Sequence, residues 1–228
     1  MNKHPYNTQM KPTHTTGVYS QKNKLFTINP DTCKNQKVYN EHLITYKGAQ
    51  YRSWNPYRSK LAALLLKRHK LTIQPTDHLL YLGAATGTTI SHLSDILTKG
   101  LIYAVESSPY AMDKLLTLAK QRKNIIPILE DANHPERYID IIEKTDLIYQ
   151  DISQRNQAQI LCNNIHTYLT AGQTAMLMVK ARSIDVSLPP PKAYQLVTDH
   201  IQQQGHKVNS IIPLQPYEKD HAALTITV

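Results

Sequence analysis

LLYLGAATGTT, residues 79–89, is the stretch that decides the fold of this chain. Its apolar run stops at Gly83, a second glycine follows at Gly87, and a helical pattern begins directly afterwards. A parallel strand turns into a helix in this way and exposes backbone N–H groups to a ligand. The next apolar run, residues 101–105, ends in Glu106, which can accept hydrogen bonds from two ribose hydroxyls. The pattern therefore predicts a site for an adenosine-type cofactor.

The spacing of the two glycines discriminates among such cofactors. A dinucleotide fingerprint reads G-x-G-x-x-G, whereas Gly83 and Gly87 are separated by three residues and no third glycine follows. A P-loop needs a Gly-Lys-Ser/Thr tripeptide, which the chain lacks. S-adenosylmethionine carries no phosphate that would require a tight cradle. The looser turn, together with Glu106, therefore favours S-adenosylmethionine over a turn without a ligand, which is the alternative interpretation.

Length and composition indicate a folded protein in a reducing compartment. The 228 residues suffice for one α/β domain of about 170 residues and a small extra module. No apolar stretch approaches the roughly 18 residues that cross a bilayer, and the N-terminus lacks the apolar core of a signal peptide. Cys33 and Cys162 form no C-x-x-C motif, so neither a disulfide framework nor a metal site is indicated. We expect a cytoplasmic protein without a membrane segment.

The formal net charge of +9 is concentrated in the first third of the chain. Residues 1–70 hold 13 Lys and Arg but two acidic residues, whereas residues 71–228 hold 13 Lys and Arg and 15 acidic residues. Such asymmetry is typical of a face that meets a polyanion, although a solvated basic module without a ligand is the alternative. RNA is favoured because aromatic side chains lie among the basic ones: Tyr39, Tyr46, Tyr51, Trp54 and Tyr57.

The sequence pattern of residues 1–53 predicts a small β-rich module. Residues 1–16 are polar and contain two prolines, so we expect them to be flexible. Strand-like runs at 25–28 and 43–46 are each followed by turn residues, at 29–31 and 47–48. A module of this size buries little apolar surface alone, so we expect it to pack on a larger domain spanning residues 54–228.

The remainder of the chain alternates strand-like and helical patterns. A helix is predicted from Pro56 to His69, because leucines cluster on one face and Pro56 suits a first turn. Strands are then predicted at 79–82, 101–105, 125–129, 146–150 and 174–180, and helices at 88–98, 109–121, 134–143, 154–169 and 191–204. Two last strands, at 207–213 and 222–228, have no helix between them. This order predicts an α/β fold: a mostly parallel, Rossmann-like sheet with helices on both faces and an antiparallel edge, as in class I methyltransferases.

Charged residues follow the predicted strands at their carboxyl ends, where ligands bind in open α/β sheets. Asp131 can accept a hydrogen bond from an adenine amino group, or it can cap the helix near Pro135. Asp151 follows the fourth strand, where a capping role is equally open. Lys180 ends an apolar run in which a buried charge needs a partner, and Asp151 is the expected carboxylate.

Eight segments that include these residues resemble the fibrillarin family, in the family's order. They are YRSWNPYRSKLAALLLK (51–67), YLGAATGTT (81–89), SHLSDI (91–96), IYAVE (102–106), NIIPILEDA (124–132), IYQDISQ (148–154), VKARSID (179–185) and PYEKDHA (216–222). WNPYRSK and VKARSID are specific to fibrillarins rather than to methyltransferases in general. The chain lacks the Gly/Arg-rich N-terminal tail of eukaryotic members and so resembles the archaeal type. It departs from the family pattern at Thr86, usually Ser, and Ser107, usually Phe, and at Ile152-Ser153, where Val-Ala is common.

The resemblance implies the transfer of a methyl group from S-adenosylmethionine to ribose 2′-hydroxyls of rRNA, with tRNA as a further substrate. It implies a catalytic set of Lys60, Asp151, Lys180 and His221. Lys180 then either stabilises developing alkoxide charge, oriented by Asp151, or acts as a neutral base. The residues expected to bind the cofactor are Gly83, Ala84, Ala85, Thr86, Gly87, Thr88, Thr89, Glu106, Ser107, Asp131, Ala132, Asp151 and Gln154.

The resemblance also implies partners: a box C/D guide RNA that pairs with the target RNA, a Nop-type scaffold protein, and a kink-turn-binding protein of ribosomal type. Four arginines are candidates for contacts with RNA phosphates, although each could equally be an ion-pair partner: Arg52, Arg58, Arg155 and Arg182. Two other functions stay open. One is a stand-alone ribose methyltransferase that needs no guide, and the other is a non-catalytic subunit of an RNA–protein particle.

Overall fold

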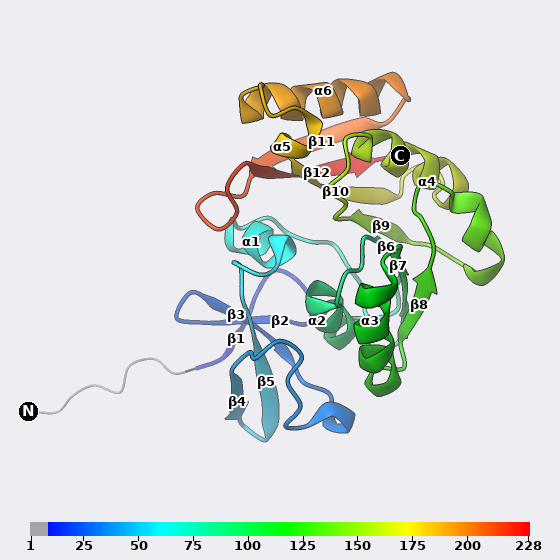
Figure 1. The fold of residues 1–228 in the computed structure, drawn as a ribbon. Coiled ribbons are helices and arrows are strands. Elements are labelled where there is room, and N and C mark those ends of the chain that lie inside the picture. The colour runs from blue at the N-terminus through cyan, green and yellow to red at the C-terminus, as the bar shows by residue number, and fades with distance from the viewer. Residues whose placement is uncertain (1–8) are drawn as a thin grey trace, which may run out of the picture.

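The computed structural model describes residues 9–228, which form one large and one small sheet (Figure 1). The large sheet has seven strands in the order β11-β12-β10-β9-β6-β7-β8. Neighbours from β10 to β8 pair in parallel, whereas β12 pairs antiparallel with both β10 and β11. The strands are β6 (His78–Leu82), β7 (Leu101–Glu106), β8 (Ile125–Leu129), β9 (Leu147–Gln150), β10 (Thr174–Lys180), β11 (Lys207–Pro213) and β12 (His221–Thr227). The predicted α/β fold with an antiparallel edge is confirmed.

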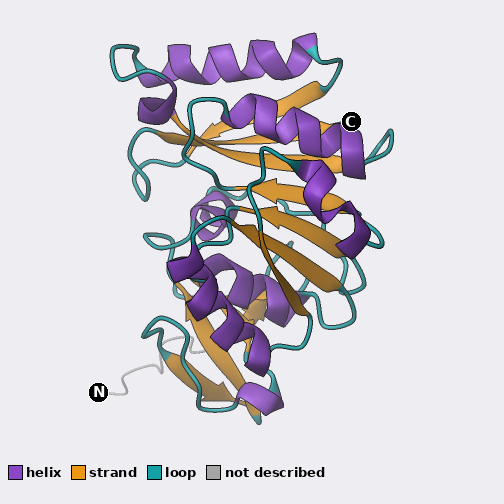
Figure 2. Cartoon of the chain, turned by 45° about the vertical axis from the view of Figure 1, so that its right-hand side comes forward, coloured by secondary structure: helices purple, strands orange, loops and turns teal. Residues whose placement is uncertain are grey.

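Helices cover both faces of the large sheet (Figure 2). Alternate residues of β6 enter two separate cores: Leu79 and Tyr81 pack with α1, α2 and α3, whereas Leu80 and Leu82 pack with α4 and α6. A strand covered on both faces is apolar throughout, which is why the run before Gly83 shows no polar alternation. The helices are α1 (Lys60–Leu66), α2 (Thr88–Ile96), α3 (Pro109–Gln121), α4 (Gln157–Tyr168), α5 (Ala181–Ile184) and α6 (Pro190–Gln203), with a 3-10 helix η2 (Pro135–Ile141).

The small sheet is antiparallel, with the order β1-β2-β3-β5-β4. Its strands are β1 (Lys11–Pro12), β2 (Val18–Gln21), β3 (Lys24–Ile28), β4 (Leu43–Tyr46) and β5 (Ala49–Trp54), and a 3-10 helix η1 (Asp31–Cys33) follows β3. One face has a small apolar cluster around Phe26 and Tyr51. The other face contributes Val18, Leu25 and Trp54 to the core shared with α1 and α2. The small sheet thus depends on the larger one for burial, although the division of the chain at residue 53 stays a prediction.

Three local predictions were wrong. The helix expected from Pro56 starts only at Lys60, because the Ser59 hydroxyl caps it by accepting a hydrogen bond from the Ala62 N–H (3.3 Å). The helix expected at 134–143 is the shorter 3-10 helix η2, and α5 was not predicted. Of the segment expected to be flexible, residues 1–8 lie outside the described part, but residues 9–16 contain β1 and a buried Met10. None of the helices within residues 9–228 is long and apolar enough to cross a membrane.

Candidate active site

The glycine turn between β6 and α2 is built around two glycines with positive φ. Gly83 (φ +83°) lies so close to the loop after β9 that a Cβ atom would be 2.6 Å from the Asp151 carbonyl oxygen. At Gly87 (φ +86°) a Cβ atom would be 2.5 Å from Leu118 of α3. The positive φ disfavours a side chain at both positions, and at Gly83 the backbone contact also excludes one sterically. The turn brings β6, the loop after β9 and α3 together at the carboxyl edge of the sheet.

A hollow of about 220 Å³ opens on one side of this turn; we call it the acidic hollow. Four carboxylates line it, and no Lys, Arg or His does so among the described residues: Glu106, Glu130, Asp131 and Asp151. A lining of this kind repels phosphates and attracts a cation. The donor set thus fits S-adenosylmethionine, which carries a positive sulfonium and no phosphate, and does not fit a dinucleotide.

The Glu106 carboxylate is oriented by the backbone around it. Oε2 accepts a hydrogen bond from the Ala85 N–H (2.7 Å), and Oε1 accepts one from the Ser108 N–H (2.8 Å). Two oxygens offer about four lone-pair sites, so about two acceptor sites are left for a ligand. Glu106 can therefore accept hydrogen bonds from two ribose hydroxyls while it holds the glycine turn in place.

Asp131 is held in an Asx-type turn. Its Oδ1 accepts hydrogen bonds from the backbone N–H (2.9 Å) and the side-chain Nδ2 (2.8 Å) of Asn133. These bonds lower the pKa of the Asp131 carboxyl below its ordinary value, so it is ionised at neutral pH. The alternative role as a helix cap was wrong, because the N-cap position of η2 belongs to His134. Recognition of an adenine amino group stays a prediction.

The other residues expected to bind the cofactor divide between two sides of the turn. Gly83, Ala85, Ser107, Ala132 and Gln154 line the acidic hollow with the carboxylates. Thr86 and Thr88 instead line a different hollow, and Ala84, Gly87 and Thr89 are buried behind the turn. Four lining residues were missed: Val105, Glu130, Ile152 and Ser153. Each directly precedes or follows a predicted site residue at a strand end, which is the signal that could have identified them.

The four expected catalytic residues come from four elements whose ends meet at the carboxyl edge. Lys60 is the first residue of α1, and its Nζ lies 2.7 Å from Oδ1 of Asp151. Both side chains are partly exposed, at 18% and 17%. Lys180 ends β10 and lies directly opposite His221, the first residue of β12, in the antiparallel register. Residues opposite each other in an antiparallel pair project from the same face, so these two side chains share one side of the sheet.

The expected ion pair between Lys180 and Asp151 was wrong. Asp151 pairs with Lys60 instead, and within residues 9–228 the Lys180 side chain makes no hydrogen bond or ion pair. Lys180 lies at the exposed end of its strand and is half-buried, so burial does not force a carboxylate upon it. The site therefore contains one neutralised lysine and one that is not neutralised.

The orientation of His221 follows from its hydrogen bond. Its Nδ1 lies 2.7 Å from the backbone oxygen of Lys219, and a carbonyl oxygen can only accept. Nδ1 therefore carries a proton and donates it, which leaves Nε2 as the lone-pair nitrogen of the neutral ring. The nearest carboxylate oxygen, Oε2 of Glu218, is 4.0 Å from Nδ1.

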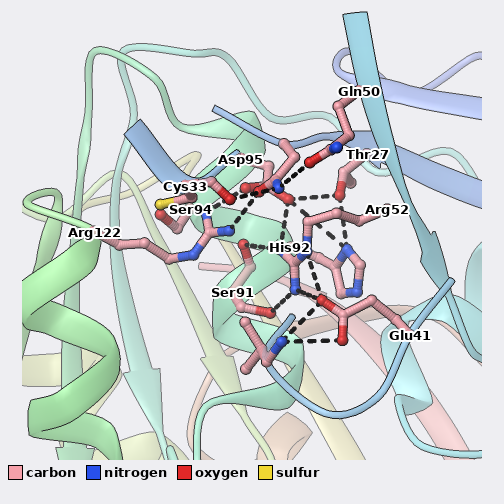
Figure 3. A network of polar contacts seen from close by, with 12 residues as sticks. Thr27, Cys33, Glu41, Gln50, Arg52, Ser91, His92, Ser94, Asp95 and Arg122 are labelled. Carbon is pink, nitrogen blue, oxygen red and sulfur yellow. Dashed lines mark hydrogen bonds and ion pairs between the residues drawn. The ribbon is translucent and has the colours of Figure 1, made fainter. Parts of the chain in front are cut away.

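The four arginines that were candidates for RNA contacts differ widely in exposure. Arg52 is fully buried in a network with Glu41 and Asp95, so its assignment to RNA phosphates was wrong (Figure 3). Arg182 forms a surface ion pair with Asp220 (2.7 Å), which was the stated alternative. Arg58 and Arg155 are exposed. Contacts of the three exposed arginines with RNA stay predictions.

The buried network joins the small sheet to α2. Arg52 of β5 donates to Glu41 Oε1 (2.8 Å), to Asp95 Oδ2 (2.8 Å) and to the Ser91 hydroxyl (2.9 Å). Arg122, directly after α3, contacts the other oxygen of Asp95. Two arginines and two carboxylates balance, which a buried ionic cluster requires. The ionic contacts fix β5 against α2 and the end of α3 (Figure 3).

A seven-stranded sheet with an antiparallel edge, a glycine turn and an acidic hollow at the carboxyl edge defines a class I methyltransferase. Within this class the sequence model of the fibrillarin family matches residues 9–228. The chain belongs to the fibrillarin family. The fibrillarin-like rRNA/tRNA 2′-O-methyltransferase of Methanocaldococcus jannaschii is 44% identical over 189 residues, 82% of each chain.

Two solved fibrillarin structures resemble the chain over nearly its whole length. Aeropyrum pernix fibrillarin, in complex with natively bound S-adenosyl-L-methionine, has a TM-score of 0.87 and 38% identity and covers 96% of this chain and 98% of its own. A fibrillarin in complex with Nop5p has a TM-score of 0.84 and 42% identity over 93% of this chain and 98% of its own. The family expected from the eight segments is thereby confirmed.

Proposed function

We propose that this chain transfers a methyl group from S-adenosylmethionine to ribose 2′-hydroxyls of RNA, as the catalytic subunit of a box C/D guide RNA–protein particle. The observation that carries the proposal is the meeting of Lys60, Asp151, Lys180 and His221 at the same sheet edge as the acidic hollow. The relatives named for rRNA/tRNA 2′-O-methylation support rRNA and tRNA as the substrates.

The acidic hollow provides for the cofactor. When bound there, S-adenosylmethionine supplies an activated methyl group on a cationic sulfonium. Glu106 accepts hydrogen bonds from its ribose, and Asp131 accepts one from its adenine amino group. The carboxylates of the hollow stabilise the positive charge and so favour the cofactor over its neutral, demethylated product.

The lysines and the histidine act on the ribose hydroxyl: they align it, stabilise its developing charge and accept its proton. Because the sulfonium already is a good methyl donor, alignment of the hydroxyl is most of the task. Lys180 has no carboxylate partner in the described chain, so its ammonium donates to the hydroxyl oxygen and stabilises alkoxide charge as it develops. Formation of the new C–O bond would break the sulfur–methyl bond of the bound cofactor and release the hydroxyl proton. Nε2 of His221, which makes no hydrogen bond within the described residues, carries a lone pair that can accept this proton. Asp151 and Lys60 hold each other beside the reacting group.

The proposal extends to partners. The fibrillarin in complex with Nop5p supports a Nop-type scaffold for this chain. Guide RNA and a kink-turn-binding protein complete the proposed particle, in which base pairing between guide and target selects the ribose.

The test is a methylation assay with radiolabelled S-adenosylmethionine and a box C/D guide–target pair, with and without the scaffold and kink-turn proteins. We expect label on the guided ribose in the full mixture and its loss with Lys180→Ala or Asp151→Ala. Label with the chain and RNA alone would indicate a stand-alone enzyme. No label in either mixture, with intact cofactor binding, would contradict catalysis and support the non-catalytic subunit.

A further inference from the structure

A second hollow lies on the other side of the glycine turn, between α3 and residues 37–40 of the loop that precedes β4. Its volume is about 670 Å³, and its lining includes Thr86 and Thr88 of the turn together with three basic residues, Lys37, Arg58 and Lys114. A further hollow of about 540 Å³ shares Gln121 with it and adds Lys120 and Lys123. The two hollows share α3 as a wall, and together we call them the basic groove.

The basic groove has no acidic side chain among the described residues that line it. Two carboxylates of the junction, Glu41 and Asp95, are buried and neutralised by Arg52 and Arg122 (Figure 3). Of the six basic residues that line the groove, Arg122 is buried and pairs with Asp95, and the other five are exposed: Lys37, Arg58, Lys114, Lys120 and Lys123. The described residues that line the groove therefore carry charge of one sign, which concentrates anions.

The groove leads to the catalytic edge. Arg58 lies two residues before Lys60, and the intervening Ser59 caps α1. The Ser59 hydroxyl also accepts a hydrogen bond from Thr89 (3.0 Å) at the start of α2, so groove and catalytic lysine are rigidly connected. The Arg58 guanidinium lies 5.4 Å from the centre of the Tyr39 ring, which places an aromatic face beside the basic residues.

We propose that the basic groove binds the phosphate backbone of a single RNA strand and guides it to the catalytic edge, an inference that rests on the proposed function. Its chemistry fits RNA rather than an acidic protein surface. Lysines along two walls neutralise successive phosphates, and Thr86, Thr117 and Gln121 offer neutral groups to sugars and bases. On α3 the basic wall extends about 9 Å along the helix axis, since Lys114 and Lys120 are six residues apart at about 1.5 Å per residue.

The test measures the fluorescence anisotropy of a fluorescein-labelled, 20-nucleotide single-stranded RNA with the full chain at several salt concentrations. The groove variant is Lys37→Gln/Lys120→Gln, with one lysine from each wall. The matched control is Lys192→Gln/Lys207→Gln, because both lysines are exposed on α6 and β11 at the far end of the molecule (Figure 1). Circular dichroism checks that each variant is folded.

We expect the groove variant to bind RNA about tenfold more weakly. Its slope of log K against log salt should fall by about 1.4, since each lost contact with a single strand contributes about 0.7. The control should stay within twofold. An equal loss in both variants, no loss in the groove variant, or no RNA binding by the unaltered chain would overturn the proposal. The proposal would also be overturned if the groove variant still bound RNA but no longer bound the Nop-type scaffold protein, because the groove would then be a protein-binding surface. Failure of the methylation assay alone would refute the proposed function and leave this binding result standing.

Discussion

The acidic hollow and the basic groove lie on opposite sides of one glycine turn and have opposite charges. Gly83 and Ala85 face the hollow with four carboxylates, whereas Thr86 and Thr88 face the groove with its lysines and Arg58. A cationic cofactor and a polyanionic substrate are therefore attracted to different places, although the turn between β6 and α2 is five residues long. The difference shows that the opposite charges on the two sides of the turn, and not the glycine pattern alone, determine which ligand binds on each side.

The largest predicted effect comes from disrupting the buried ionic network at the junction of the small sheet with α2 and α3. Arg52→Ala leaves Glu41 and one oxygen of Asp95 buried without their partner. We expect the free energy of unfolding to fall by about 3–5 kcal/mol, measured by urea denaturation. Arg58→Ala, a matched change at an exposed arginine, should cost less than about 1 kcal/mol. Equal losses from the two variants would show that the network contributes nothing beyond a surface pair.

The second prediction separates catalysis from cofactor binding at the hollow. Lys60 and Asp151 form an ion pair at the edge of the hollow, and Lys60→Ala removes its positive member. We expect the methylation rate to fall about 100-fold because a positioned charge is lost. Calorimetry should show an affinity for S-adenosylmethionine within twofold of the unaltered chain. A full rate, or a fall in affinity as large as the fall in rate, would contradict this role.

The third prediction tests the hollow as the cofactor site. Glu106→Ala removes two acceptors for ribose hydroxyls, and each hydrogen bond contributes about 1–1.5 kcal/mol. We expect calorimetry to give an affinity for S-adenosylmethionine lower by about 30-fold, with RNA binding unchanged. Glu106→Gln keeps one acceptor oxygen, so its affinity for S-adenosylmethionine should lie between those of the unaltered chain and Glu106→Ala. Unchanged cofactor affinity in Glu106→Ala would exclude Glu106 from the site.

The smallest predicted effect is on pH dependence and comes from His92 in the junction. Burial, and secondarily the charges of Arg52 and Arg122, hold the pKa of His92 well below its ordinary value. Below about pH 6.5 the unfolded chain binds a proton that the folded His92 does not, so the free energy of unfolding falls as pH falls, by up to about 1.4 kcal/mol per unit. Urea denaturation between pH 7 and pH 5 should show a shallower decline for His92→Gln. An identical decline would mean that His92 titrates normally.

The sequence was sufficient for the large sheet, because its strands are short apolar runs between clear turns. The sequence was not sufficient at α1, because two nearby residues could each start the helix, and the helix begins after the Ser59 cap rather than at Pro56. The sequence also did not reveal the ion-pair partners of two charged residues, because these partners are distant along the chain. Arg52 is paired with Asp95, 43 residues away, and Asp151 with Lys60, 91 residues away. An arginine in a basic segment shows no sign of burial until the fold brings a carboxylate to it.

The acidic hollow could be predicted only in part for a similar reason. Glu106 and Asp131 are recognisable because each follows the carboxyl end of a predicted strand, and both line the hollow. Thr86 and Thr88 belong to the same motif but line the basic groove, since successive residues of a tight turn point in different directions. Which side of the turn each residue faces depends on α3 and the loop after β9, and neither is near in sequence.

The most direct test of the sorting by charge is one calorimetric titration of S-adenosylmethionine into three proteins: the unaltered chain, Glu106→Ala and Lys37→Gln/Lys120→Gln. The account predicts that the groove variant binds the cofactor with the affinity of the unaltered chain, while Glu106→Ala loses about 30-fold. A loss of cofactor affinity in the groove variant as large as that in Glu106→Ala would contradict it. The two sides of the turn would then be one site.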